Sequence, residues 1–80
     1  MNVQQLPIIA PSAYKHGEGD DDILHAVRNV MITHVGDEGF TMVVGPTTDA
    51  VLIEVGYVFS TDDRMLIIHA FRPARPKYLR

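Results

Sequence analysis

Two acid–base side chains stand inside long apolar segments: Glu54 in AVLIEVGYVF (residues 50–59) and His69 in RMLIIHAF (residues 64–71). Because residues 60–63 resemble a turn, we expect the two segments to form a hairpin with Glu54 directly opposite His69 on one face. A carboxylate beside an imidazole fixes the tautomer and favours the charged form, which suits a general acid or base near neutral pH. A structural Glu–His hydrogen bond is the alternative that the pattern leaves open.

The surroundings of this pair depend on the register of the hairpin. Gly56 lies one step along the same face and has no side chain, so the sequence predicts room there for a ligand. A loop one residue longer or shorter would instead put Glu54 and His69 on opposite faces.

Positive charge is concentrated immediately after His69, although the chain carries a net charge of −3 at pH 7. Four of the seven Lys and Arg residues lie in the last nine positions: Arg72, Arg75, Lys77 and Arg80. Arginine suits bidentate phosphate contacts, and Tyr78 could stack on a base or donate a proton. Pro73 and Pro76 restrict the backbone, so this segment, residues 72–80, is expected to hold its charges in place beside His69. A solvated basic end is the alternative.

Three further histidines lie earlier in the chain. Lys15 and His16, just before Gly17, are either a basic patch or two cations favourably placed at the end of a helical turn. His34 adjoins a turn and is expected at the surface. His25 follows two acids at metal-ligand spacing, but those acids are explained by a helix N-terminus, and we expect neither a metal nor another cofactor.

Length and composition predict one small domain, residues 1–80, in which 46% of the residues are hydrophobic. The chain has no cysteine, which fits a reducing cytoplasm, and no segment resembles a signal peptide or a membrane span. Because so short a chain forms a small core, we expect self-association or a partner protein to add stability.

The elements expected to position these residues form an α+β domain, with two N-terminal helices packed on a four-stranded antiparallel sheet. The first helix is a single turn from Pro11 to Gly17, and the second covers residues 17–31 with Asp20 as its N-cap. Its apolar face comprises Ile23, Leu24, Val27, Val30 and Met31. The strands are residues 31–35, 40–44, 50–59 and 64–71, and residues 1–10 form an edge strand or a packing arm.

Several short motifs resemble BrnT-like bacterial toxins, within the RelE/ParE-like set of toxin–antitoxin ribonucleases. They are K-H-G at 15–17, G-P at 45–46, L-I-E-V at 52–55 and I-I-H-A-F-R-P-A-R-P-K-Y-L at 67–79. The resemblance covers about residues 12–80. It implies a metal-independent endoribonuclease that cleaves messenger RNA, inhibits growth and is silenced by an antitoxin. The expected assemblies are a homodimer or a hetero-oligomer with the antitoxin.

The resemblance also implies roles for individual residues. Lys15 and His16 match the K-H-G positions, and Tyr78 with either Arg72 or Arg75 matches a terminal basic–aromatic segment. His69 replaces a serine of that group, and the chain is acidic where such toxins are basic. The expected catalytic residues are His69, Glu54, His16, Arg72 and Tyr78, and the expected RNA-binding residues are Lys15, Arg75, Lys77 and Arg80. The alternative function is a noncatalytic interaction module that dimerises or docks a partner protein through its sheet.

Overall fold

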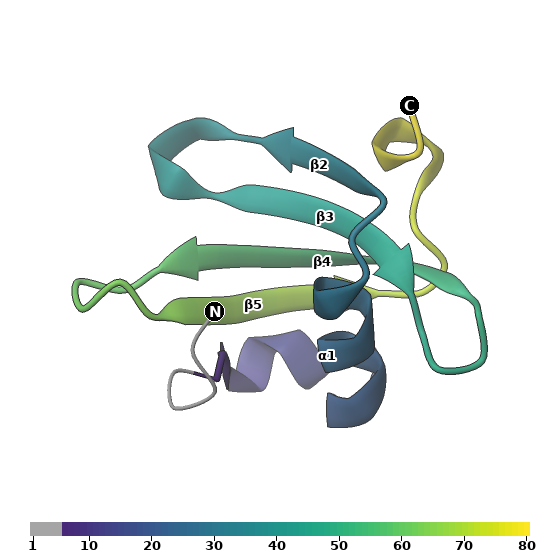
Figure 1. Cartoon of the computed structure of the whole chain (residues 1–80), viewed down its shortest axis with the longest axis horizontal. Helices are drawn as coiled ribbons and strands as arrows, with labels where there is room; N and C mark the ends of the chain where they lie inside the picture. Colours follow the sequence, from purple (N-terminus) through teal and green to yellow (C-terminus); the bar gives the residue numbers. More distant parts are fainter. Residues whose placement is uncertain (1–5) are drawn as a thin grey trace.

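The computed structural model describes residues 6–80 and contains a five-stranded sheet with one α-helix across one face (Figure 1). The strand order is β1-β5-β4-β3-β2, in which β1 is parallel to β5 and the other pairs are antiparallel. The strands are β1 (Ile8–Ile9), β2 (Ile32–Val35), β3 (Thr41–Pro46), β4 (Leu52–Phe59) and β5 (Met65–Phe71). The helix is α1 (Asp20–Arg28), and short 3₁₀ turns cover Pro11–Tyr14, Asp37–Gly39 and Pro76–Tyr78.

The predicted arrangement of two helices on a four-stranded antiparallel sheet is wrong. The first expected helix is only the 3₁₀ turn Pro11–Tyr14, because Gly17, with φ +89°, ends it before an α-helical nucleus can form. The predicted arm contributes a fifth strand, β1, at the edge of the sheet, which confirms the edge-strand alternative. Residues 1–5 of that arm lie outside the described part of the chain.

Helix α1 rests on the face of the sheet that carries the main core. Ile23 and Ala26 are fully buried, and α1 approaches β3 so closely that a Cβ at Gly45 would lie 2.2 Å from the Ala26 carbonyl oxygen. Glycine at position 45 therefore sets the distance between helix and sheet. The core on this face comprises Ala13, Ile23, Ala26, Val43, Ile53, Val55, Ile67 and Ala70.

The ends of α1 differ from the prediction. Gly19, not Asp20, occupies the N-cap position, and the helix ends at Arg28. Val30 and Met31 consequently leave the apolar face of the helix and are exposed. The helical spacing of apolar residues continues to Met31, although the helix ends at Arg28. Periodicity alone therefore overestimated the length of the helix.

The predicted strands are present, but the β4–β5 turn is longer than expected. Phe59 pairs with Met65, so the turn contains residues 60–64 and not residues 60–63. A regular ladder continued from this turn would place Glu54 and His69 on opposite faces of the sheet.

A β-bulge then changes the register. Ile68 is the extra residue in β5, and beyond it Gly56 pairs with His69 and Glu54 pairs with Phe71. The predicted direct pairing of Glu54 with His69 is therefore wrong. Their shared face is nevertheless present, because the longer turn and the bulge each shift the alternation by one residue.

The second face of the sheet is covered by Phe40 and the C-terminal segment, residues 72–80. A Cβ at Gly56 would lie 2.7 Å from the Phe40 ring, so the room predicted there for a ligand is filled. Ala74 N donates to the Leu52 carbonyl, which holds the C-terminal segment beside β4. This second layer buries Glu54 completely, on the side of the sheet opposite α1.

Candidate functional site

Glu54 and His69 are in direct contact. His69 Nε2 lies 2.8 Å from Glu54 Oε2, across the diagonal of the β4–β5 ladder. The Glu54 side chain is 0% exposed and the His69 side chain is 27% exposed. The contact joins a buried carboxylate to an imidazole that reaches solvent, so the predicted proximity of the two residues is confirmed.

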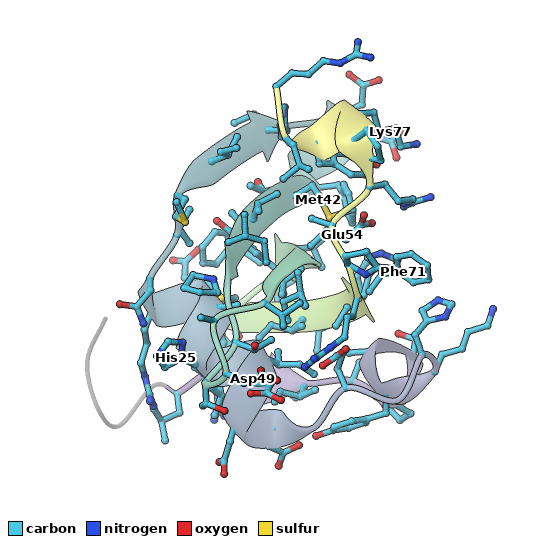
Figure 2. The ribbon with its side chains drawn as sticks, turned by 90° about the vertical axis from the view of Figure 1, so that its right-hand side faces the viewer. His25, Met42, Asp49, Glu54, Phe71 and Lys77 are labelled. Atoms are coloured by element: carbon cyan, nitrogen blue, oxygen red, sulfur yellow. The ribbon has the colours of Figure 1, made fainter. Side chains whose placement is uncertain are left out.

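Arg75 completes the environment of Glu54. Its backbone N–H and its Nε donate to Glu54 Oε1 at 2.9 and 3.0 Å, and its Nη2 donates to Oε2 at 2.6 Å. The guanidinium that was expected to bind RNA thus forms an ion pair with a buried acid. Figure 2 shows Glu54 on the side of the sheet that faces the C-terminal segment.

This hydrogen-bond pattern determines the charge state of Glu54. Burial alone would raise the pKa of the carboxyl group, but the donors of Arg75 and His69 outweigh it and lower the pKa to about 2. An ionised carboxylate can only accept hydrogen bonds, so His69 Nε2 must carry a proton. In the neutral imidazole the unprotonated nitrogen is therefore Nδ1, which is available as a proton acceptor.

The backbone of β5 presents His69 in this orientation because the bulge is held from outside the hairpin. Ser12 Oγ donates to the Ile68 carbonyl at 2.7 Å, and Ala10 N donates to the Ile67 carbonyl at 2.8 Å. Residues at the start of the first 3₁₀ turn thus satisfy two carbonyls on the side of β5 that faces β1. Nothing in the local sequence signals this role for Ser12, because its partner lies 56 residues away.

His16 lies beside the pair, as its position in the K-H-G motif suggested. Its ring centroid is 5.9 Å from that of His69 and 4.8 Å from that of Phe71. Lys15 and His16 are exposed, and neither is at the end of an α-helix. Phe71, which sequence analysis did not select, has its ring centroid 6.5 Å from that of His69 and 5.5 Å from the Arg75 guanidinium carbon.

Tyr78 borders the site through Arg75. The Arg75 guanidinium carbon is 5.4 Å from the Tyr78 ring centroid, and Lys77 Nζ is 5.0 Å from it. His34, expected at the surface, is half-buried and its Nε2 lies 2.9 Å from the Tyr78 carbonyl oxygen. Lys77 and Arg80 are exposed, and among residues 6–80 neither forms an ion pair.

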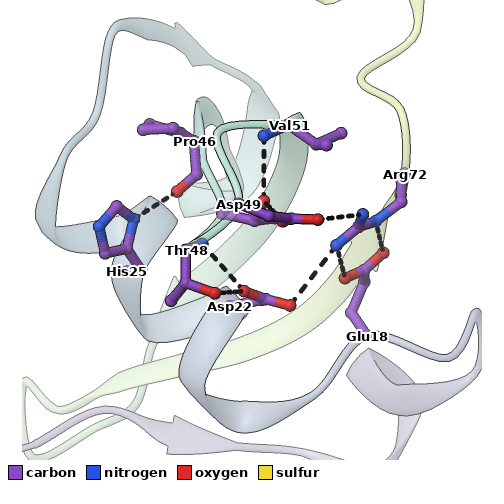
Figure 3. Close-up of polar contacts among 9 residues, drawn as sticks. Glu18, Asp22, His25, Pro46, Thr48, Asp49, Val51 and Arg72 are labelled. Carbon is purple, nitrogen blue, oxygen red and sulfur yellow. Dashed lines mark hydrogen bonds and ion pairs between the residues drawn. The ribbon is translucent and has the colours of Figure 1, made fainter.

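Arg72 belongs to a different cluster, shown in Figure 3. Its Nε is 2.8 Å from Glu18 Oε1, and its Nη atoms reach Asp22 and Asp49 at 3.5 Å. Hydrogen bonds from Thr48 lower the pKa of Asp22, and Arg72 adds to this effect. The structure therefore separates Arg72 from the Glu54–His69 pair and surrounds it with three acids.

The remaining histidine, His25, faces the β3–β4 loop. Its Nδ1 lies 2.7 Å from the Pro46 carbonyl oxygen, while Asp22 bonds to Thr48 in the same loop. These residues connect α1 to the loop. In the described part of the chain, no three His, Cys, Asp or Glu side chains are grouped so that they could hold a metal ion.

Comparison of the chain with protein-family models, with curated proteins and with solved structures found no match. The likeness to BrnT-like toxins stays a prediction that depends on the motifs quoted above. Within residues 6–80, no helix is both long enough and apolar enough to cross a membrane.

Proposed function

We propose that the chain is a metal-independent endoribonuclease, acting as the toxin of a toxin–antitoxin pair. The observation that carries the proposal is the pair formed by buried Glu54 and solvent-reaching His69, with a second exposed imidazole, His16, at a ring-centroid distance of 5.9 Å. Two imidazoles on either side of a phosphodiester can supply the base and the acid that RNA cleavage requires.

The reaction uses the substrate's own 2′-hydroxyl group as nucleophile. His69 Nδ1 removes the proton of the 2′-hydroxyl, and the resulting oxygen attacks phosphorus. The bond to the 5′-oxygen breaks, and protonated His16 donates a proton to that leaving oxygen. The products are a 2′,3′-cyclic phosphate and a 5′-hydroxyl end. Glu54 keeps the proton of His69 on Nε2 and so keeps Nδ1 in the acceptor form.

The cations divide into two groups in this proposal. Arg75 serves Glu54, and Arg72 serves the acids of its own cluster, so neither guanidinium is a free phosphate ligand. Lys15, Lys77 and Arg80 are exposed and provide the positive surface for the RNA backbone. Action on messenger RNA would place the protein in the cytoplasm, where a cognate antitoxin would have to cover this surface.

The test is cleavage of a single-stranded RNA oligonucleotide, with the product ends identified by mass. His69→Gln keeps a donor towards Glu54 but removes the titratable nitrogen, and we expect it to slow cleavage by about 100-fold or more. His16→Gln should also slow cleavage. His25→Gln replaces the imidazole that faces the β3–β4 loop. It is the matched control and should leave the cleavage rate unchanged.

RNA binding can be tested separately from RNA cleavage. Replacing Lys15, Lys77 and Arg80 by Ala should weaken RNA binding and flatten its salt dependence while the dyad stays intact. A wild-type protein that neither binds nor cleaves RNA would overturn the proposal. Glu54, His69 and Arg75 would then be a structural clamp, and the noncatalytic interaction module would be the better interpretation.

A further inference from the structure

The two edges of the sheet differ in how they meet solvent. β1 has only two residues, Ile8–Ile9, and prolines at positions 7 and 11 flank it, which limits pairing with another strand. β2 has four residues, Ile32–Val35, and contains neither proline nor a charged side chain. Figure 1 shows β2 along the opposite edge, where no other strand of the described chain covers it.

The backbone of β2 has hydrogen-bonding groups directed away from the sheet. Gly36 N donates to the Phe40 carbonyl, so the hydrogen-bonded pairs of the β2–β3 ladder fall on even-numbered residues of β2. The N–H and C=O groups of Thr33 and Val35 therefore point outward. An unpaired row of this kind is a template for another strand.

The side chains on this edge are apolar and exposed. Val35 is 82% exposed and Met31 is 65% exposed, while Thr33 between them is also exposed. Thr33 and Val35 lie on the face that carries α1, because Thr33 pairs with core residue Val43 and side chains alternate along β2. Met31 lies just before the strand, where its N–H donates to the Val44 carbonyl. α1 packs on β3 and β4, and leaves this part of the face uncovered.

We infer that β2 is the interface of a symmetric homodimer, in which two copies pair their β2 strands antiparallel and join their sheets. A two-fold axis at Thr33 places Thr33 opposite Thr33 of the second copy. Val35 of each copy then lies near the point where the other copy enters β2 at Met31, so exposed apolar side chains come together at both ends of the interface.

Charge complementarity favours a second copy as the occupant. The chain enters β2 from Arg28 and leaves it towards Asp37 and Glu38, and all three side chains are exposed. Antiparallel pairing brings the basic entry of one copy to the acidic exit of the other. This inference is independent of the ribonuclease proposal, since β2 contributes none of its catalytic residues.

The experiment is sedimentation velocity of the full chain over a range of concentrations. We expect the mass to rise from 8.9 kDa to twice that value. Thr33→Pro removes an outward donor without removing a β2–β3 hydrogen bond, and should weaken dimerisation by about 100-fold. Val35→Lys should weaken it by about tenfold. Ile8→Lys, on the β1 edge, is the matched control and should leave the dimer unchanged.

A charge exchange tests the two-fold arrangement. Arg28→Glu alone should weaken the dimer, and the double variant with Glu38→Lys should restore it, because both members of each pair are reversed. A chain that stays monomeric at all concentrations would overturn the inference. So would a dimer that is indifferent to Thr33→Pro and Val35→Lys, or open-ended growth into larger assemblies.

Discussion

Arg72 and Arg75 are three residues apart in the same basic segment, yet the structure uses them differently. Arg72 bonds Glu18 through two nitrogens, at 2.8 and 3.2 Å, and reaches the more exposed Asp22 and Asp49 near the start of α1 only at 3.5 Å. Arg75 makes short contacts with one fully buried carboxylate on the other side of the sheet. We therefore expect the contribution of a cation to stability to depend on the solvation of its partner more than on the number of acids around it.

The physical reason is desolvation. An acid that solvent reaches, such as Asp49 at 62% exposure, keeps most of its hydration whether or not Arg72 is present. A buried acid has lost its hydration, so its charge depends on the donors that surround it. Arg75 and His69 are those donors for Glu54. The positions of both side chains are therefore tied to the same carboxylate.

The largest expected effect comes from removing Arg75. Arg75→Met leaves the Glu54 carboxylate buried without its guanidinium partner, and should lower the melting temperature by about 15 °C or more. Thermal unfolding followed by circular dichroism measures this. The double variant Arg75→Met with Glu54→Leu should recover part of the loss, since it removes the unpaired charge. A melting temperature unchanged in Arg75→Met would show that Glu54 does not depend on this ion pair.

A second prediction concerns acid. Because the pKa of Glu54 is lowered from 4.5 to about 2 by its donors, its ionised form stabilises the folded state. This contribution, about 2–3 kcal/mol, should be fully present above pH 4.5 and lost as the pH falls towards 2. Chemical denaturation of wild type and Glu54→Gln across this pH range isolates it. The free-energy difference between them should shrink on acidification, and a constant difference would contradict the assignment.

The smallest effect is expected for Arg72. Arg72→Met removes two long contacts that solvent and salt already screen, together with the bond to Glu18, which is 6% exposed, and should lower the melting temperature by less than Arg75→Met does. Added salt should reduce the difference from wild type, whereas the Arg75 variant should respond little to salt. Equal losses for the two arginine variants would contradict this expectation. They would show that the Glu18 contact contributes as much to stability as the Glu54 contacts.

The cations of the C-terminal segment, residues 72–80, also differ in their partners. Sequence analysis grouped Arg72, Arg75, Lys77 and Arg80 in one basic segment, with Arg72 expected in catalysis and the other three in RNA binding. The structure divides them, because the first two have carboxylate partners and the last two are exposed. A triple alanine change that included Arg72 and Arg75 would therefore perturb the fold along with any RNA binding, and it is not a clean test of either.

Much of the secondary structure could be predicted because it depends on local pattern. The acidic start of α1, the hairpin around Gly36–Gly39 and the two long apolar strands all appear in the structure. The predictions that failed depend on single residues. They concern the end of the helix, the length of the β4–β5 turn and the extent of the first helical turn. One-residue changes in these elements alter which face a side chain occupies, and propensities do not resolve them.

The sequence by itself determined that a lone acid and a lone imidazole would occupy neighbouring apolar strands followed by a basic segment. Only the tertiary structure decided that they meet, because that depends on a bulge at Ile68 that Ser12 supports from the far end of the chain. It also decided which arginine completes the site. Those outcomes depend on contacts between residues more than 20 positions apart, whose burial and geometry exist only once the sheet has assembled.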